Sequence, residues 1–212
     1  MEGDPMPKPD LENAYSLQTP EDAKRLYADW AETYDQSFAQ AMDFALPQKV
    51  AKAFAAAGGA GPVLDFGCGT GLVGEELARL GVGPIDGADL SPEMLAVAER
   101  KDVYRDLIAD NVLDGLTVRG GQYAGVVSSG TFTHGHVGPE ALEELLRIAA
   151  PGAQFALSIN GAHFDAAGFA ATFNALGRRI TGLDLPDIRF YGDKATGPHK
   201  DDTGKLALFR KA

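Results

Sequence analysis

The sequence has a single cysteine among 212 residues, so no internal disulfide can form. It contains no Cys/His cluster at the spacing of a zinc site, and no apolar run approaches the ~18 residues of a membrane-spanning helix. Positive charge is also scarce. Lys and Arg total 19 against 30 Asp and Glu, which gives a formal net charge of −11. We therefore expect no metal and no membrane partner.

The acidic balance bears on the partners and on the compartment. Binding to a nucleic acid backbone needs clustered Lys and Arg, which this sequence lacks. We therefore expect a small-molecule partner and no nucleic acid. The first residues, MEGDPMPKPD, lack the charged-then-apolar pattern of a secretory signal. A cytoplasmic protein is the resulting expectation, whereas the oligomeric state is left open.

The chain divides into a tail, a helical segment and an alternating region. Residues 1–18 are rich in proline and acids, which is typical of a mobile tail. Residues 19–60 carry helix patterns, the first beginning at Thr19-Pro20 and the last ending at Gly58. We predict a single domain over residues 19–212 with an N-terminal helical cap over 19–60.

The region after the cap alternates short apolar runs with helix patterns. This order predicts an α/β fold, Rossmann-like and doubly wound, with a mostly parallel sheet covered on both faces. Two final strand candidates are joined only by a loop, so they pair most easily as an antiparallel hairpin at one edge. The expected strands are 63–66, 84–88, 106–109, 123–128, 154–159, 178–191 and 205–211, and the expected helices are 70–80, 91–100, 139–150 and 165–176.

A strand runs directly into a glycine loop at residues 63–71, VLDFGCGTG. Gly67, Gly69 and Gly71 permit a tight turn and let a ligand approach the backbone. Ligands of open α/β sheets bind outside the carboxyl ends of the strands. The loop therefore predicts a ligand site, in which Cys68 is interpreted as a small residue suited to a tight turn.

Two ligand classes fit this loop. Gly69, Gly71 and Gly74 match the GxGxxG pattern of dinucleotide sites. Asp65, however, would place a carboxylate beside a diphosphate that needs free N–H donors. S-adenosylmethionine (AdoMet) carries an ammonium and a sulfonium but no phosphate. The residues favour AdoMet, and a nicotinamide dinucleotide remains the alternative.

Acidic residues that follow the next two strands indicate that the ligand contains a nucleoside. Asp89 ends the second strand, where a carboxylate can accept hydrogen bonds from two ribose hydroxyls. Leu90 and Met94 are placed to flank an adenine ring. Asp110 and Asn111 follow the third strand, where a carboxylate can accept from the adenine amine.

Three segments resemble the motifs of class I AdoMet-dependent methyltransferases, namely 63–71, 87–94 and 107–110. The likeness extends over about residues 25–160. It implies a seven-stranded sheet with a reversed last hairpin, AdoMet as cofactor and S-adenosylhomocysteine as product. Segments 29–35, 87–95 and 130–137 further resemble the methyltransferase-like protein 27 (Williams–Beuren region) group.

The resemblance also assigns residues to parts of the cofactor. Asp65 and Gly67 would lie near the methionine, and Ser128 and Ser129 would face the methionine and the substrate. A helix before the first strand lies over the cofactor in this family. Trp30 and Tyr34 share one face of that helix, which is most simply a packing face. The alternative is contact with the sulfonium, since a cation is attracted to an aromatic ring.

Two histidines, His134 and His136, flank Gly135 in the loop after the fourth strand. No third metal ligand is apparent, so we predict no metal site. The histidines are either loop residues bonded to the backbone or groups that contact the substrate or act as a general base.

These observations predict an AdoMet-dependent methyltransferase that transfers a methyl group to a small-molecule acceptor by in-line displacement. Because no base is obvious in the sequence, a non-catalytic AdoMet-binding protein is one alternative. A nicotinamide-dependent oxidoreductase that uses the glycine pattern at residues 69–74 is the other.

Overall fold

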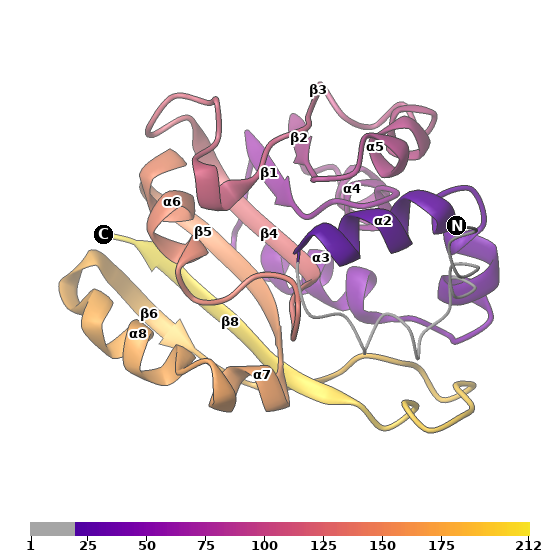
Figure 1. The fold of residues 1–212 in the computed structure, drawn as a ribbon. Helices are drawn as coiled ribbons and strands as arrows, with labels where there is room; N and C mark the ends of the chain where they lie inside the picture. The colour runs from indigo at the N-terminus through magenta and orange to yellow at the C-terminus, as the bar shows by residue number, and fades with distance from the viewer. Residues whose placement is uncertain (1–19) are drawn as a thin grey trace, which may run out of the picture.

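A computed structural model describes residues 20–212, with side chains described from residue 25. The predicted tail over residues 1–18 and Thr19, where the first helix was expected to begin, lie outside the described residues. Strands and helices alternate along the chain (Figure 1). The strands are β1 (Val63–Phe66), β2 (Ile85–Ala88), β3 (Asp106–Ile108), β4 (Tyr123–Phe132), β5 (Ala149–Asn160), β6 (Ile180–Asp184), β7 (Asp187–Arg189) and β8 (Thr203–Lys211). The helical segments are α2 (Pro20–Trp30), η1 (Asp35–Gln40), α3 (Leu46–Ala56), α4 (Leu72–Arg79), α5 (Pro92–Glu99), η2 (Val112–Asp114), α6 (Ala141–Ile148), α7 (Gly161–Ala166), α8 (Phe169–Leu176) and η3 (Gly177–Arg179).

One sheet runs through the molecule in the order β3-β2-β1-β4-β5-β8-β6, and β7 also pairs with β8. The first five strands in this order are parallel to one another, whereas β8 is antiparallel to β5, β6 and β7. β1 and β2 are buried along their whole lengths, as expected for parallel strands covered by helices on both faces. The predicted Rossmann-like α/β fold with an antiparallel edge is confirmed.

Two elements near the C-terminus differ from the prediction. The strand expected over residues 178–191 is divided into β6 and β7, with Pro186 between them, because proline offers no N–H to the strand ladder. Within residues 20–212 the sheet therefore has eight strands rather than seven. The helix expected over residues 165–176 is two helices, because Gly168 adopts a left-handed φ of 76° between them.

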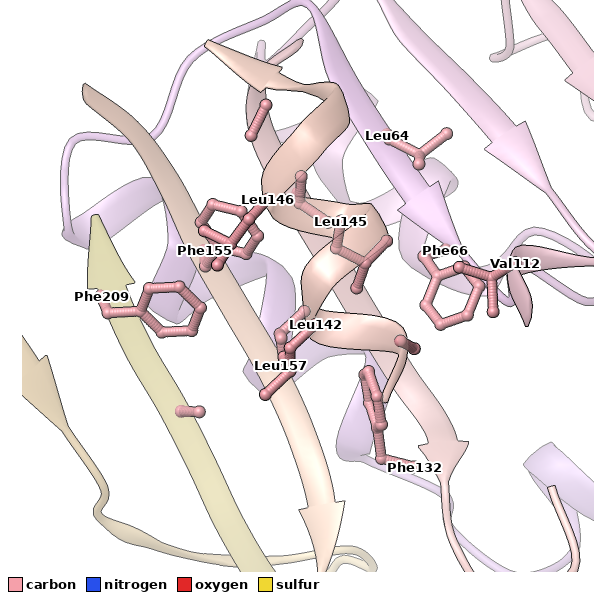
Figure 2. Packing of buried hydrophobic residues seen from close by; sticks show 14 of the residues in the cluster. Leu64, Phe66, Val112, Phe132, Leu142, Leu145, Leu146, Phe155, Leu157 and Phe209 are labelled. Atoms are coloured by element: carbon pink, nitrogen blue, oxygen red, sulfur yellow. The ribbon is translucent and has the colours of Figure 1, made fainter. Parts of the chain in front are cut away.

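Apolar clusters cover both faces of the sheet. On one face α6, α7 and α8 pack against β4, β5 and β8, and on the other α2, η1, α3 and α4 pack against the same sheet (Figure 1). None of the helices within residues 20–212 combines the length and apolar character needed to cross a membrane. Figure 2 shows the first cluster, in which Leu142, Leu145 and Leu146 of α6 face Phe155 and Leu157 of β5 and Phe209 of β8.

The order of the strands creates a crevice between β1 and β4. The chain places β2 and β3 on one side of β1 and then returns to place β4 on the other side. At such a reversal the loops after neighbouring strands diverge, which leaves a ligand crevice at their carboxyl ends. The segment 67–71 leaves β1 at this crevice, and β4 loses its regular register with β5 between Ser128 and Phe132.

We predict that Arg105→Leu lowers the free energy of unfolding by about 1–3 kcal/mol, because a buried acceptor would lose its charged donors. Asp86 on β2 is 1% exposed and accepts from Arg105 Nε at 2.9 Å and Nη2 at 2.6 Å. The Tyr123 hydroxyl, which donates to the same carboxylate at 3.0 Å, would be its remaining partner. Urea denaturation measures the loss. Arg119→Leu at an exposed position is the control, and equal losses in the two variants would contradict the prediction.

Candidate active site

A partly enclosed pocket occupies the crevice between β1 and β4. Its walls are the glycine loop, the start of α5, the segment after β3, the irregular end of β4 and two tyrosines of the N-terminal helices. Among the described residues, those lining the pocket include the carboxylates Asp89 and Asp110 but no Lys or Arg. This charge distribution favours a cationic or neutral ligand over a phosphate.

The glycine loop presents its backbone to the pocket. Gly67, Gly69 and Gly71 all have positive φ, at 65°, 52° and 92°, which other residues adopt only with strain. A Cβ at Gly67 would collide with the side chain of Thr131, whereas a Cβ at Gly69 would meet nothing within 4 Å. Gly67 is therefore required by packing inside the protein, and Gly69 leaves open space in front of the backbone.

Asp89 fixes this loop from the end of β2. Its Oδ2 accepts from the Gly69 N–H at 2.8 Å, and its Oδ1 accepts from the Ser91 N–H at 2.9 Å. Burial raises the pKa of Asp89, and these backbone donors oppose that rise. A carboxylate has about four lone-pair positions, so Asp89 can still accept hydrogen bonds from a ligand. Ser91 also caps α5, accepting from the Met94 N–H at 3.2 Å.

Asp65 lies behind the loop and does not line the pocket. It is fully buried, its Oδ2 accepts from the Tyr104 hydroxyl at 2.6 Å, and its Oδ1 has no partner among the described residues. Burial raises the pKa of Asp65 to about 7, although the Tyr104 hydrogen bond opposes the rise. A Cβ at Gly71 or Gly74 would contact the Tyr104 ring. Asp65 therefore supports the loop through Tyr104.

The opposite end of the pocket is formed by the residues predicted to hold adenine. Leu90 and Met94 line it, as do Asp110 and Asn111. Asp110 Oδ2 accepts from Thr117 through both its N–H, at 2.8 Å, and its hydroxyl, at 2.6 Å. Asn111 caps η2 with its side-chain oxygen. The protein thus orients both polar side chains independently of a ligand.

The helices before β1 close the pocket with aromatic rings. Tyr27 and Tyr34 line it, with ring centroids 6.1 Å apart. Burial raises the pKa of both tyrosines, so their hydroxyls stay protonated at neutral pH. Trp30 does not line the pocket. It is 3% exposed in the adjoining core and donates from Nε1 to Ser37 Oγ at 3.0 Å, which matches the packing interpretation of this residue.

A polar cluster fastens the helical cap to the glycine loop. Asp35 of η1 accepts from the Thr70 hydroxyl at 2.6 Å and pairs with Lys101 at 2.8 Å. Lys101 also pairs with Glu75 of α4 at 2.6 Å, and its side chain is 12% exposed. Since a well-shielded ion pair is screened less than a surface pair, this cluster holds the cap closed over the pocket.

The structure separates the two serines at the end of β4. Ser128 is fully buried and does not line the pocket, whereas Ser129 does. Side chains alternate along a strand, and Ser128 pairs with Leu157, which belongs to the cluster beneath α6. Ser129 consequently faces the pocket, with a buried Oγ that has no partner among the described residues.

The two predicted histidines also have different environments. His134 is exposed and does not line the pocket, whereas His136 does. His136 Nδ1 lies 3.2 Å from the carbonyl oxygen of His134, and its Nε2 is buried without a partner among the described residues. Burial lowers the pKa of His136. Cys68 lines the pocket as a buried thiol whose pKa burial raises, so it stays protonated.

Sequence reasoning did not single out Tyr104 or Thr131. Tyr104 lies in no motif. The spacing of Gly71 and Gly74, three residues apart on one helical face, was a signal for close packing by a large side chain. Thr131, whose hydroxyl donates to the Phe66 carbonyl at 3.3 Å, is placed by the irregular end of β4, and irregular strand ends leave little trace in a sequence.

Comparison with known proteins finds similarity over part of this chain. Residues 63–152 match the family described as "Methyltransferase domain". The 18S rRNA (guanine(1575)-N(7))-methyltransferase of Saccharomyces cerevisiae is 36% identical over 66 residues, 31% of this chain and 24% of the relative. The ribosomal protein L11 methyltransferase of Dechloromonas aromatica is 36% identical over 67 residues, 32% of this chain and 22% of the relative. Each match thus spans about a quarter of the relative's own length.

Solved structures agree on the fold. The 1,6-didemethyltoxoflavin-N1-methyltransferase of Burkholderia thailandensis, solved with S-adenosylhomocysteine, superposes with a TM-score of 0.63 over 92% of each chain at 19% identity. Over residues 63–152 the chain is thus similar to methyltransferase domains, and its Rossmann-like fold is shared with solved AdoMet-dependent methyltransferases. AdoMet is therefore the cofactor to test against the pocket.

The pocket residues fit this cofactor. AdoMet is cationic and lacks phosphate, and the lining of the pocket offers two carboxylates and no Lys or Arg among the described residues. The open space before Gly69 and the unpartnered Ser129 Oγ are further features that a bound ligand would fill.

One prediction from composition is corrected by the comparisons. The acidic net charge led us to expect a small-molecule partner and to exclude nucleic acid. The curated relatives are named for rRNA and for a ribosomal protein, so the net charge of the chain does not exclude a macromolecular partner. Net charge averages over the whole surface, whereas a partner contacts only one part of it.

We predict that Asp65→Asn becomes progressively more stable relative to the wild type as pH rises from about 4 to 7. The folded-state pKa of Asp65, about 7, lies above the ordinary value of 3.8. The folded protein therefore retains a proton that the unfolded chain loses, and its stability falls with rising pH in this window and levels off above it. The relative gain reaches the order of 4 kcal/mol.

Urea denaturation at a series of pH values measures this difference. Asp193→Asn removes an exposed carboxylate and is the matched control for the loss of one negative charge. A difference between Asp65→Asn and the wild type that stays constant with pH would show that Asp65 does not titrate with a raised pKa.

We predict that Lys101→Met loosens the helical cap, because Asp35 and Glu75 lose their shared cation. The free energy of cap opening should fall by about 1 kcal/mol, which amide hydrogen exchange of residues 26–38 measures. The fluorescence of Trp30, the sole tryptophan, provides a second readout through its quenching by acrylamide. Arg100→Met, which breaks an exposed pair with Glu32, is the control. Equal exchange rates in the two variants would show that the ion pairs of Lys101 do not hold the cap closed.

Proposed function

We propose that this chain binds AdoMet in the pocket between β1 and β4 and transfers its methyl group to an acceptor. The observation that carries the proposal is the lining itself, in which a glycine loop with open backbone stands beside two carboxylates and no basic side chain among the described residues. When bound, AdoMet supplies an activated methyl group on its sulfonium. The protein has to bind, orient and shield the reactants, and orientation alone can contribute roughly 7–11 kcal/mol at its extreme.

The proposed roles of the site residues follow from their positions on the wall. Asp89 accepts the ribose hydroxyls, and Asp110 with Asn111 lies at the adenine, flanked by Leu90 and Met94. The backbone of Gly67, Cys68 and Gly69 faces the methionine part. Gly71, which the sequence also assigned to the cofactor, does not line the pocket and instead leaves room for Tyr104. Tyr34 and Tyr27 cover the sulfonium. Asp65 acts through Tyr104 as a positioning residue, and of the two serines assigned to the methionine side only Ser129 lies on the wall.

The structure gives the glycine pattern at residues 69–74, which suggested a nicotinamide dinucleotide, another explanation. The third glycine of the GxGxxG pattern, Gly74, is explained by contact with Tyr104, because a Cβ there would collide with the ring. A diphosphate would also lie beside the Asp89 carboxylate, with no basic side chain in the described lining of the pocket.

The acceptor assay follows from the relatives. Because these are named for rRNA and ribosomal protein, RNA and ribosomal subunits are the first acceptors to test with radiolabelled AdoMet. Incorporation of label would distinguish an enzyme from a non-catalytic AdoMet-binding protein. The likeness of segments 29–35, 87–95 and 130–137 to the methyltransferase-like protein 27 group stays a prediction.

We predict that Asp89→Ala weakens AdoMet binding by about 2–3 kcal/mol, since charge-assisted hydrogen bonds contribute about 1.5–3 kcal/mol each when lost. Isothermal titration calorimetry measures the affinity for AdoMet and, in parallel, for NAD. The wild type should bind AdoMet and show no comparable heat with NAD.

Asp89 also holds the Gly69 N–H, so loss of loop structure has to be separated from loss of a ligand contact. Urea denaturation of the same variant reports the structural part. Asp106→Ala removes a carboxylate whose side chain is 69% exposed and should leave AdoMet affinity unchanged. Unchanged affinity in Asp89→Ala, or tight binding of NAD, would refute the proposed function.

A further inference from the structure

A second pocket continues from the first toward β5 and the loop before β8. The two pockets share five lining residues, namely Tyr27, Tyr34, Phe44, Gly130 and His136. The second extends to Thr133 and Tyr191, which do not line the first. A group held there lies next to whatever occupies the first pocket, beneath the same closed cap.

The walls of this second pocket are aromatic and uncharged. Seven of them are Phe or Tyr side chains, and among the described lining residues none is Asp, Glu, Lys or Arg. The rings pack against one another, as with Phe38 and Phe44 at a centroid distance of 5.1 Å and Phe44 and Tyr191 at 5.7 Å. Aromatic rings prefer offset or edge-to-face contact with other rings, which contributes about 0.5–1.5 kcal/mol beyond the buried area. A planar, neutral ring suits this wall, and an ionised group would lack a partner.

His136 supplies one directed polar atom at the boundary of the two pockets. Its Nδ1 lies 3.2 Å from the His134 carbonyl oxygen, and a carbonyl oxygen only accepts. The Nδ1 atom must therefore carry the hydrogen, which leaves a lone pair on Nε2 in the neutral ring. Nε2 is buried and has no partner among the described residues, and a buried acceptor without a donor is costly. A hydroxyl or N–H on a bound ring would satisfy it.

We propose that the second pocket is the acceptor subsite, that it takes a neutral aromatic or heteroaromatic ring bearing a hydroxyl or N–H, and that His136 Nε2 receives the proton of that group. This inference rests on the proposed function for the transfer step. The ring-binding part stands on the second pocket alone.

The proposed step balances without a further reactant. The acceptor's O–H or N–H bond breaks as its oxygen or nitrogen forms a bond to the methyl carbon. The proton goes to His136 Nε2, and the electron pair of the broken carbon–sulfur bond remains on sulfur as a neutral thioether. Positioned proton transfer of this kind contributes typically 10²–10⁴-fold to a rate.

The surroundings of His136 keep it in the form that accepts a proton. The Tyr27 ring packs against it at a centroid distance of 5.6 Å, and His134 and His163 are the neighbouring titratable groups on its own loop and on α7. Burial is the main reason that the pKa of His136 is lowered. The hydrogen bond with the His134 backbone opposes this shift, and the nearby His163 and His134 side chains add to the lowering. The imidazole is therefore neutral at pH 7.

The first experiment tests ring binding without turnover. Saturation-transfer NMR on protein loaded with S-adenosylhomocysteine measures the affinity for phenol and 2-hydroxypyridine, with cyclohexanol as a non-planar control of similar size. The two aromatic probes should bind more tightly than cyclohexanol. Thr133→Phe, which fills the second pocket only, should weaken them at least about tenfold. Thr181→Phe on the exposed edge strand β6 should not change their affinity.

The second experiment assigns the proton acceptor. His134 and His136 are matched, because both lie in the same loop and differ in exposure. Nitrogen-15 shifts of the His136 ring should report a lone pair on Nε2 that moves when 2-hydroxypyridine is added, whereas the His134 ring should not respond. In an assay with an acceptor shown to be methylated, His136→Gln should reduce turnover about 10²-fold and remove the rise of the rate with pH that deprotonation of His136 causes in the wild type. His134→Gln should leave both unchanged.

The outcomes separate this inference from the proposed function. If the wild type binds AdoMet but shows no preference for planar probes, the proposed subsite is overturned and the proposed function stands. The same conclusion follows if Thr133→Phe binds the aromatic probes as tightly as the wild type does. Probe binding without a His136 response overturns the role of His136. If the wild type does not bind AdoMet, the proposed function itself is overturned. Guanosine and a short RNA, titrated in the same way, decide whether the ring enters free or as part of a larger molecule.

Discussion

The Asp89 carboxylate is the constraint on which the site depends. One of its oxygens holds the Gly69 N–H of the loop after β1, and the other holds the Ser91 N–H at the start of α5 after β2. Two neighbouring strands are thereby joined at their carboxyl ends, and the glycine backbone is kept in left-handed conformations that an unsupported loop would lose. The Asp89 side chain also lines the pocket, so the carboxylate that holds the loop backbone is placed to bind the ligand as well.

The remaining parts of the site arrange themselves around this joint. Tyr104 fills the space that Gly71 and Gly74 leave and buries Asp65 behind the loop. Asp35 and Lys101 fasten the helical cap to the front of the loop through Thr70 and Glu75. The pocket is consequently bounded by one rigid wall from the sheet and by one wall of tyrosines that a few polar contacts hold in place. The cap also packs on the sheet through the apolar cluster that includes Leu26, Trp30 and Phe38, and a backbone bridge pairs Phe44 with Tyr191.

Much of this could be predicted from the sequence because the signals are local. The alternation of apolar runs and helices predicts the parallel sheet, and the glycines of segment 63–71 predict the tight turn that follows β1. Predictions failed where distant contacts decide. Ser128 and Ser129 are equivalent in sequence, but the pairing of β4 with β5 turns Ser128 away from the pocket. His134 and His136 look alike until the cap covers one of them.

By itself the sequence determined the fold class, the glycine loop and the acids at the ends of two strands, because each follows from periodicity, from backbone freedom or from position after a strand. The tertiary structure alone decided which side chains form the pocket wall. It brought Tyr27 and His136 into the wall and removed Trp30 and Asp65 from it, since burial depends on packing between segments far apart in the chain. The aromatic second pocket belongs to the same category. Its walls come from the N-terminal cap, β4, β5 and the loop before β8, and only folding brings these segments together.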